Sequence, residues 1–206
     1  MKPATDHPPV LGILGGIASG KSFVAACFED LGAGRLDADR AGHEVLCEPE
    51  VQAAAKARWG DAVFDADGRI RRSSLAAIVF GPDPQAPAEL AFLEHLTHPR
   101  IGEKLREQAD LHAAAGKKLL ILDAPVMLEA GWDTMCRWVA FVEVAEDVRL
   151  RRAAERGWSR DAYRAREAAQ APLDVKRRRA DFVLDNSGTP DEMRAQVARL
   201  WSSLVG

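Results

Sequence analysis

A glycine-rich turn that ends in Lys-Ser is the stretch of this sequence best suited to chemistry. Its residues Gly15, Gly16, Ile17, Ala18, Ser19, Gly20, Lys21 and Ser22 match the pattern G-x-x-x-x-G-K-[ST] at every fixed position. Glycines let a backbone wrap closely around an anion, and the wrapped amides then donate to phosphate oxygens. We expect Lys21 to reach the β- and γ-phosphates of a nucleotide and the Ser22 hydroxyl to ligate Mg²⁺. The pattern predicts a phosphate loop that holds a nucleoside triphosphate.

Carboxylates follow two further apolar segments. Asp37 and Asp39 come after a short predicted strand at 34–36, and Asp123 ends the apolar run 118–123. Ligands of open α/β sheets lie beyond the carboxyl ends of the strands, so both sites are expected beside the phosphate loop. Asp37 and Asp39 would share one side if the strand continued with period two, although a solvated acidic loop fits the spacing equally well. Asp123 resembles the Walker-B acid that helps to hold Mg²⁺.

Arginines crowd the segment 147–179, which also contains Glu155, Asp161 and Glu167. One interpretation is a solvated helix face. The interpretation we favour is a mobile lid, because arginine binds phosphate with two donors and closure over a transferred phosphate is common in kinases. A nucleic-acid site is disfavoured by the formal net charge of −3 and by the scarcity of aromatics among the arginines.

The elements that must position these residues alternate along the chain. Strands are predicted at 10–14, 34–36, 118–123, 138–144 and 180–184. Val24, Cys27, Phe28 and Leu31 mark the buried face of a helix after the phosphate loop, and Thr189 opens a capping box for the last helix. Pro99 is expected to open a helix over 99–115, with His98 just before it. The order predicts an α/β fold with a parallel sheet flanked by helices, a P-loop fold of the small-molecule kinase type.

Composition limits the class of protein to which this chain can belong. The 206 residues, 47% of them apolar, suit one domain with an elaboration. The longest apolar run is too short to span a membrane. Cys27, Cys47 and Cys136 lie far apart without a C-x-x-C pair, as expected of reduced thiols in a cytoplasmic protein.

Several stretches together resemble the bacterial dephospho-coenzyme A kinase family over roughly residues 10–190. Besides the phosphate loop, they are the Asp-Ala-Asp of 37–39, the Leu-Thr-His-Pro-Arg-Ile of 96–101, the Leu-Asp-Ala-Pro-Val-Met-Leu-Glu of 122–129, Arg166, Gln170 and Lys176, and the stretch 180–188. The resemblance implies phosphorylation of the ribose 3′-hydroxyl of dephospho-coenzyme A by ATP with Mg²⁺, the last step of coenzyme A synthesis. Neither nucleic acid nor a membrane is an expected partner, and the chain is expected to be a monomer or a weak homo-oligomer.

The resemblance also assigns roles to residues. It makes Asp39 the general base, Arg152 and Arg156 the phosphate contacts of the lid, and Asp37, His98, Pro125 and Glu129 residues of the acceptor side. The domains it implies are a nucleotide-binding core at 10–39, 98–146 and 180–206, a helical acceptor-binding insertion at 40–97, and the lid at 147–179.

Two positions depart from the family pattern. Ala18 replaces a glycine, which is harmless unless the position needs a positive φ, where the cost would be about 1 kcal/mol. Phe23 replaces a small hydroxyl residue and is expected to pack.

Other functions stay open on the residues alone. A P-loop kinase for nucleosides or nucleotides would share the same core. A GTPase switch or a regulatory binding module is less favoured, because such guanine readers carry Asn-Lys-x-Asp, which this sequence lacks.

Overall fold

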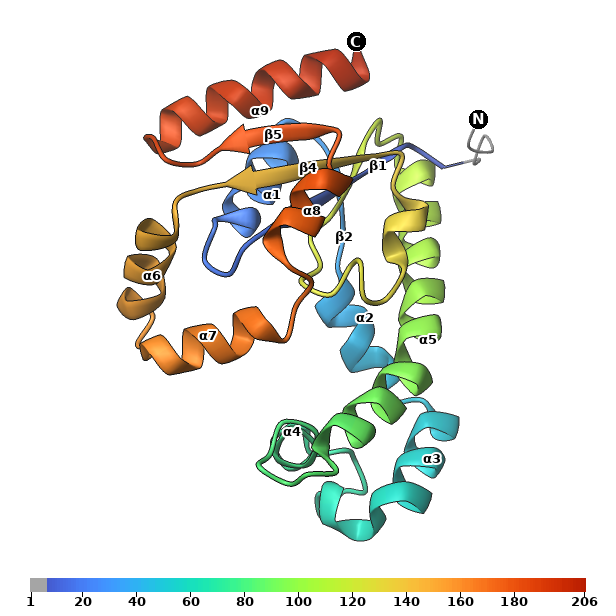
Figure 1. Cartoon of the computed structure of the whole chain (residues 1–206). Coiled ribbons are helices and arrows are strands. Elements are labelled where there is room, and N and C mark those ends of the chain that lie inside the picture. The colour runs from blue at the N-terminus through green and yellow to red at the C-terminus, as the bar shows by residue number, and fades with distance from the viewer. Residues whose placement is uncertain (1–6) are drawn as a thin grey trace. The chain divides into compact units, whose positions relative to one another are not determined.

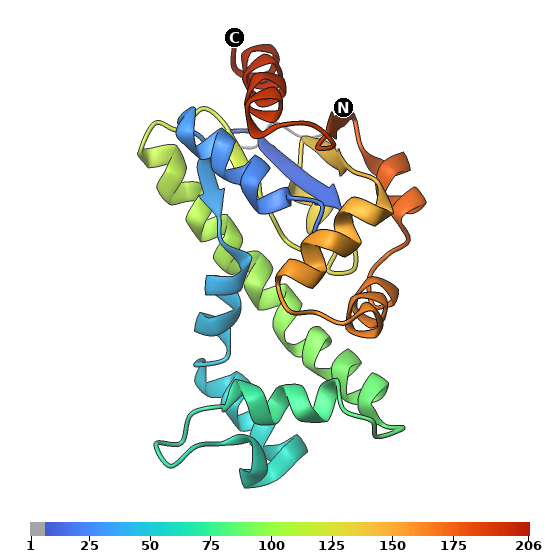
Figure 2. The same cartoon turned by 90° about the vertical axis from the view of Figure 1, so that its left-hand side faces the viewer.

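The structure is a computed structural model that describes residues 7–206, shown in two views in Figures 1 and 2. The chain forms two compact units. One comprises residues 7–37 with Glu107–Gly206, and the other is Ala38–Arg106. Each unit has its own hydrophobic core and is described separately below.

A parallel sheet is the centre of the first unit. Among the described residues its strands are β1 (Val10–Gly15), β2 (Gly34–Leu36), β3 (Leu120–Leu122), β4 (Trp138–Glu143) and β5 (Phe182–Asp185). Their order is β2-β3-β1-β4-β5, and each pair of neighbours is parallel. Every residue of the central strand β1 is buried, as expected of a strand covered on both faces. The predicted parallel α/β fold is confirmed.

Two helices cover one face of this sheet (Figure 1). They are α1 (Lys21–Asp30) and α9 (Pro190–Val205), and Val24, Phe28 and Val197 pack with strand residues in one core cluster. The predicted capping box at Thr189 is present. Leu31, expected on the buried face of α1, lies just beyond that helix and is 40% exposed.

The other face is covered by α8 (Leu173–Arg179), which contacts β1 and β4, and by the loop after β3 with its short 3-10 helix η2 (Trp132–Met135). This loop comes so close to β1 that a Cβ on Gly12 would lie 2.7 Å from Met127 Sδ and 2.8 Å from Cys136 Sγ. The glycine therefore permits the close packing of loop against strand.

Two helices connect β4 to α8. These are α6 (Glu146–Glu155), which begins one residue before the arginine-rich segment, and α7 (Arg160–Ala168), which lies inside it. Figure 2 shows α6 beyond the carboxyl end of β1, where the phosphate loop begins. The arginine-rich segment therefore borders the predicted nucleotide site.

The second unit is helical. It contains α2 (Ala38–Val45), α3 (Pro49–Trp59), the 3-10 helix η1 (Gly60–Val63), α4 (Arg72–Val79) and the part of α5 (Ala86–Ala114) up to Arg106. Val63, Leu75 and Val79 form its buried centre. The Glu89 carboxylate fastens α5 to α3 by accepting hydrogen bonds from Arg58 and from the Trp59 indole.

The prediction that Pro99 opens a helix is wrong, because Pro99 lies inside α5. An interior proline removes one backbone donor and crowds the preceding turn. Two neighbouring side chains also donate to carbonyls of the same helix. Thr97 Oγ1 donates to Leu93 O at 2.8 Å, and Arg100 Nη1 donates to Leu96 O at 2.7 Å. His98 is therefore a half-buried residue within a helix rather than one that precedes it.

The premise that β2 continues through Asp39 is also wrong. The strand ends at Leu36 and α2 begins at Ala38, so the period of two does not apply. Asp37 belongs to the first unit, where its backbone N–H donates to Gln108 Oε1 at 2.7 Å and its carbonyl accepts from Gln108 Nε2 at 3.2 Å. Asp39 is exposed in the first turn of α2, in the second unit.

No helix within residues 7–206 is long and apolar enough to cross a membrane.

Candidate active site

The phosphate loop joins the end of β1 to the start of α1, as its pattern predicts. Gly20 caps α1 with φ 96°, and a Cβ there would lie 2.2 Å from Asn186 Nδ2. Only glycine satisfies both the positive φ and the space. Ala18 also has a positive φ, of 57°. The substitution at Ala18 therefore falls in a left-handed conformation, where we expected a cost of about 1 kcal/mol.

Packing and hydrogen bonds hold the loop in this shape. The Ala18 methyl lies in a small apolar cluster with Ala153 and Tyr163. The Ser19 carbonyl accepts from Asn186 Nδ2 at 2.6 Å and from Arg152 Nη1 at 3.3 Å. Contacts with α6, with α7 and with Asn186 after β5 therefore hold the loop in place.

Lys21 turns back over the loop, where its ammonium donates to Gly15 O at 3.3 Å and Gly16 O at 3.1 Å. Its pKa is lowered to about 8, chiefly because burial disfavours the charged form. Asp123 opposes this shift, whereas the positive charges of Lys176, Arg156 and Arg149 add to it. The site therefore carries an excess of positive charge around Lys21.

Ser22 and Asp123 lie together, as a magnesium site would require. Ser22 Oγ donates to Asp123 Oδ2 at 2.9 Å, and the Asp123 side chain is 6% exposed. Arg35 Nη2 lies 3.7 Å from the same carboxylate oxygen. Hard oxygen donors of this kind suit Mg²⁺, which uses one or two protein ligands together with substrate phosphates. Within residues 7–206, no cluster of three or more His, Cys, Asp or Glu side chains could hold a metal ion.

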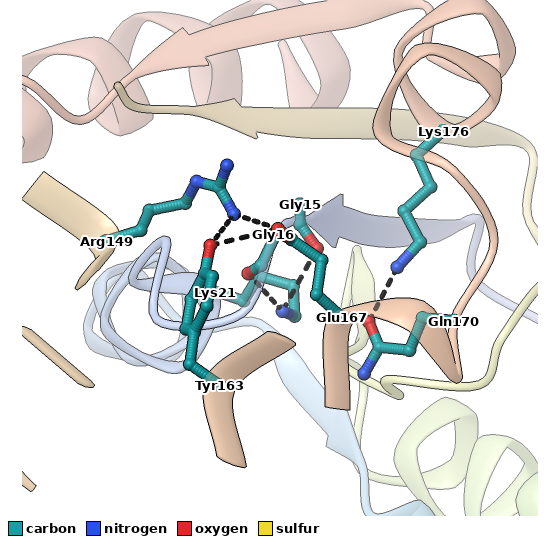
Figure 3. A network of polar contacts seen from close by, with 8 residues as sticks. All are labelled: Gly15, Gly16, Lys21, Arg149, Tyr163, Glu167, Gln170 and Lys176. Atoms are coloured by element: carbon teal, nitrogen blue, oxygen red, sulfur yellow. Dashed lines mark hydrogen bonds and ion pairs between the residues drawn. The ribbon is translucent and has the colours of Figure 1, made fainter. Parts of the chain in front are cut away.

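The guanidinium of Arg149 is buried against the loop (Figure 3). A Cβ on Gly16 would lie 2.7 Å from Arg149 Nη1. That nitrogen donates to the Tyr163 hydroxyl and to the Glu167 carboxylate, and the Tyr163 hydroxyl donates to Glu167 Oε1 at 3.0 Å. Burial and the hydrogen bond to Glu167 raise the pKa of Tyr163 to about 12, so the hydroxyl keeps its proton. This network joins α6 to α7 behind Gly16.

The two arginines expected to contact phosphate differ in their surroundings. The guanidinium of Arg152 donates to two backbone carbonyls, from Nη1 to Ser19 O and from Nη2 to Asn186 O at 3.1 Å. Arg156 caps the end of α6 and is exposed. Arg152 therefore stabilises the loop in this structure, and the side chain of Arg156 is accessible to solvent.

The residues assigned to the acceptor side do not form one cluster in the first unit. Pro125 and Glu129 lie in the loop after β3, and both are exposed. Glu129 Oε1 accepts the backbone N–H of Ala171 at 2.6 Å, which anchors the segment between α7 and α8. His98 and Asp39 belong to the helical unit.

Two residues of the site, Arg149 and Asn186, are not among those that the sequence patterns predict. Arg149 is one arginine among many, and nothing in the sequence indicates that it is buried and bonded to Tyr163 and Glu167. Asn186 did carry a signal, since it follows a strand at its carboxyl end as Asp123 does. Phe23 packs against the core beside α9, as expected.

Comparison with known proteins agrees with this geometry. The sequence profile of the family described as Dephospho-CoA kinase matches residues 9–192. A dephospho-CoA kinase of Syntrophotalea carbinolica is 41% identical over 199 residues, which cover 95% of this chain and 92% of that protein. The crystal structure of TT1252 from Thermus thermophilus superimposes with a TM-score of 0.79 at 32% identity, covering 97% of this chain and all of that one. A dephospho-CoA kinase from Campylobacter jejuni shares the fold, with a TM-score of 0.64 at 22% identity over 96% of this chain and 98% of that one.

Three observations agree with one another. Ser22 of the phosphate loop donates to Asp123 at the end of β3, the parallel sheet has the order β2-β3-β1-β4-β5, and the family profile matches residues 9–192. The chain belongs to the dephospho-CoA kinase family.

Proposed function

We propose that this protein transfers the γ-phosphoryl group of ATP to the ribose 3′-hydroxyl of dephospho-coenzyme A, giving coenzyme A and ADP. The observation that carries the proposal is the hydrogen bond between Ser22 of the phosphate loop and Asp123 at the end of β3, in a chain that matches the family over residues 9–192. Enzymatic phosphoryl transfer depends mainly on positioning and on charge stabilisation. The first unit of this chain supplies the charged residues around the phosphate loop.

The backbone amides from Gly15 to Gly20 are proposed to hold the phosphates of ATP, aided by the N-terminus of α1. On binding, the Lys21 ammonium exchanges its two carbonyl acceptors for the β- and γ-phosphate oxygens. Arg152 and Arg156 are proposed to stabilise the charge that spreads over the transferred oxygens. Ser22 and Asp123 would hold Mg²⁺, which neutralises charge between the β- and γ-phosphates when it is bound.

Asp39 is proposed as the general base that orients the ribose hydroxyl and accepts its proton. Its exposure in the first turn of α2 leaves the carboxylate accessible to a substrate. The insertion expected at 40–97 is proposed to bind the acceptor, with Asp37, His98, Pro125 and Glu129 as acceptor-side residues. The segment 147–179 is proposed to close over the nucleotide as a lid. We also propose that the protein works in the cytoplasm, where its three free cysteines would remain reduced.

Mass spectrometry of a reaction with ATP, Mg²⁺ and dephospho-coenzyme A tests the proposal. We expect the acceptor to gain one phosphoryl group, and we expect no gain with Lys21→Ala, whose fold is checked by circular dichroism. A panel of nucleosides and nucleotides under the same conditions tests the alternative acceptors. Faster phosphorylation of any of them than of dephospho-coenzyme A would contradict the proposal.

A further inference from the structure

Lys176 is a buried cation to which the proposed mechanism gives no role. It lies on α8, its side chain is buried, and its residue is 2% exposed. Its ammonium donates to Gln170 Oε1 at 2.7 Å, the one hydrogen bond that it makes to residues 7–206 (Figure 3). An ammonium carries three donors, and burying a charge is costly unless it is well paired. A neutral amide alone is a poor partner for a cation at this depth.

The carboxylates near Lys176 are bound to other groups. Glu167 accepts from Arg149 and Tyr163, and Glu129 accepts the backbone N–H of Ala171. Their negative charges raise the pKa of Lys176, but burial has the larger effect and lowers it overall. The protein therefore leaves the charge of Lys176 incompletely compensated.

This uncompensated charge acts on the phosphate loop. Of the three cations that lower the pKa of Lys21, Lys176 has the largest effect. In the view of Figure 3, Arg149 and Lys176 approach the loop from opposite sides with Lys21 between them. Positive side chains therefore surround a loop whose backbone amides are suited to bind an anion. A multiply charged anion there would reduce the repulsion between these cations, and it would accept the hydrogen bonds that Lys176 does not make within residues 7–206.

We propose that Lys176 is a further phosphate-binding residue, which donates to the terminal phosphoryl group of ATP while Gln170 holds its ammonium in position. The inference rests on the proposed kinase function. The terminal group is assigned because Lys21, the loop residue that reaches the β- and γ-phosphates, lies between Arg149 and Lys176 in the view of Figure 3. With one donor on Gln170, two remain for phosphate oxygens. Lys176 stabilises charge as the phosphoryl group leaves ADP for the acceptor, and it transfers no proton itself.

The test compares ligands that differ in the terminal phosphoryl group. In Lys176→Met we expect affinity for the imido analogue of ATP to fall about ten- to hundredfold, because hydrogen bonds to charged groups are strong. Affinity for ADP should stay unchanged, as measured by titration calorimetry with Mg²⁺. The kcat should fall about 10²- to 10³-fold, with an unchanged KM for dephospho-coenzyme A. Lys176→Arg should recover part of the kcat.

A thermal melt separates this role from a structural one. Replacing an incompletely paired buried ammonium with methionine should leave the melting temperature unchanged or raise it. The control is Arg178→Gln, which removes a positive charge from the exposed face of the same helix and should change neither affinity. If Lys176→Met does not fold, Lys176→Gln is measured in the same assays.

Equal loss of affinity for ADP and for the imido analogue would overturn the inference, as would a lowered melting temperature with unchanged kcat. The binding measurements contain no acceptor. If the wild-type chain failed to phosphorylate dephospho-coenzyme A, the proposed function would fail while the difference between the two nucleotides would still report on Lys176.

Discussion

Binding of ATP should be coupled to protonation of Lys21. The pKa of this ammonium is lowered to about 8 in the nucleotide-free protein, mainly by burial and then by the neighbouring cations. Phosphate oxygens favour the charged form, so the pKa rises when ATP binds. Well below pH 8 Lys21 is already charged, so the protein takes up few protons when ATP binds. Above pH 8 each binding event must also protonate Lys21.

The size of the effect follows from the pKa. With a value of about 8, roughly nine-tenths of Lys21 is charged at pH 7 and roughly one-tenth at pH 9. Affinity for ATP should therefore fall about tenfold between pH 7 and pH 9, and proton uptake should approach about 0.9 per ATP at pH 9. Titration calorimetry in buffers of different ionisation enthalpy measures both quantities.

Lys21→Arg is the matched variant, because a guanidinium stays charged throughout this pH range. Its affinity should vary much less with pH, and any proton uptake that remains belongs to another group, of which Lys176 is the first candidate. Equal pH dependence and equal uptake in the parent protein and in Lys21→Arg would refute the reasoning.

Three further substitutions test other parts of the site. Asp39→Asn should lower kcat about 10²- to 10⁴-fold while ATP still binds by calorimetry, and near-normal turnover would disprove the base assignment. Arg149→Met leaves Tyr163 and Glu167 without their buried cation, so the free energy of unfolding in urea should fall by about 3 kcal/mol; a loss under 1 kcal/mol would contradict the importance of this network. Ser19→Ala removes a buried hydroxyl that has no hydrogen-bond partner among the described residues, and should raise the nucleotide-free stability by about 1 kcal/mol. A lower melting temperature would count against that account.

The core of the site could be predicted because its signals are local in the sequence. The phosphate loop is contiguous, and Asp123 ends an apolar strand. A parallel sheet brings the carboxyl ends of its strands to one edge. The contact between Ser22 and Asp123 therefore follows from two short stretches that are 101 residues apart.

Other features depend on tertiary packing, which cannot be predicted from any short stretch of the sequence. Pro99 has the same local preference for the first turn of a helix as Pro49, which opens α3, yet α5 begins at Ala86 and continues through Pro99. Similarly, the burial of Arg149 and Lys176 depends on how α6, α7 and α8 pack around the loop. Among many basic residues of similar sequence surroundings, only the fold distinguishes the buried ones.

The conformation of Ala18 has a consequence for the thermodynamics of nucleotide binding. A glycine at this position would sample many backbone conformations in the free protein, and binding would have to remove that entropy. Alanine held at φ 57° by its packed methyl group has already lost most of that freedom during folding. Part of the backbone entropy that ATP binding would otherwise remove is therefore already lost at Ala18 when the chain folds. A loop ordered in this way should bind phosphate with a smaller entropy loss than its glycine counterpart.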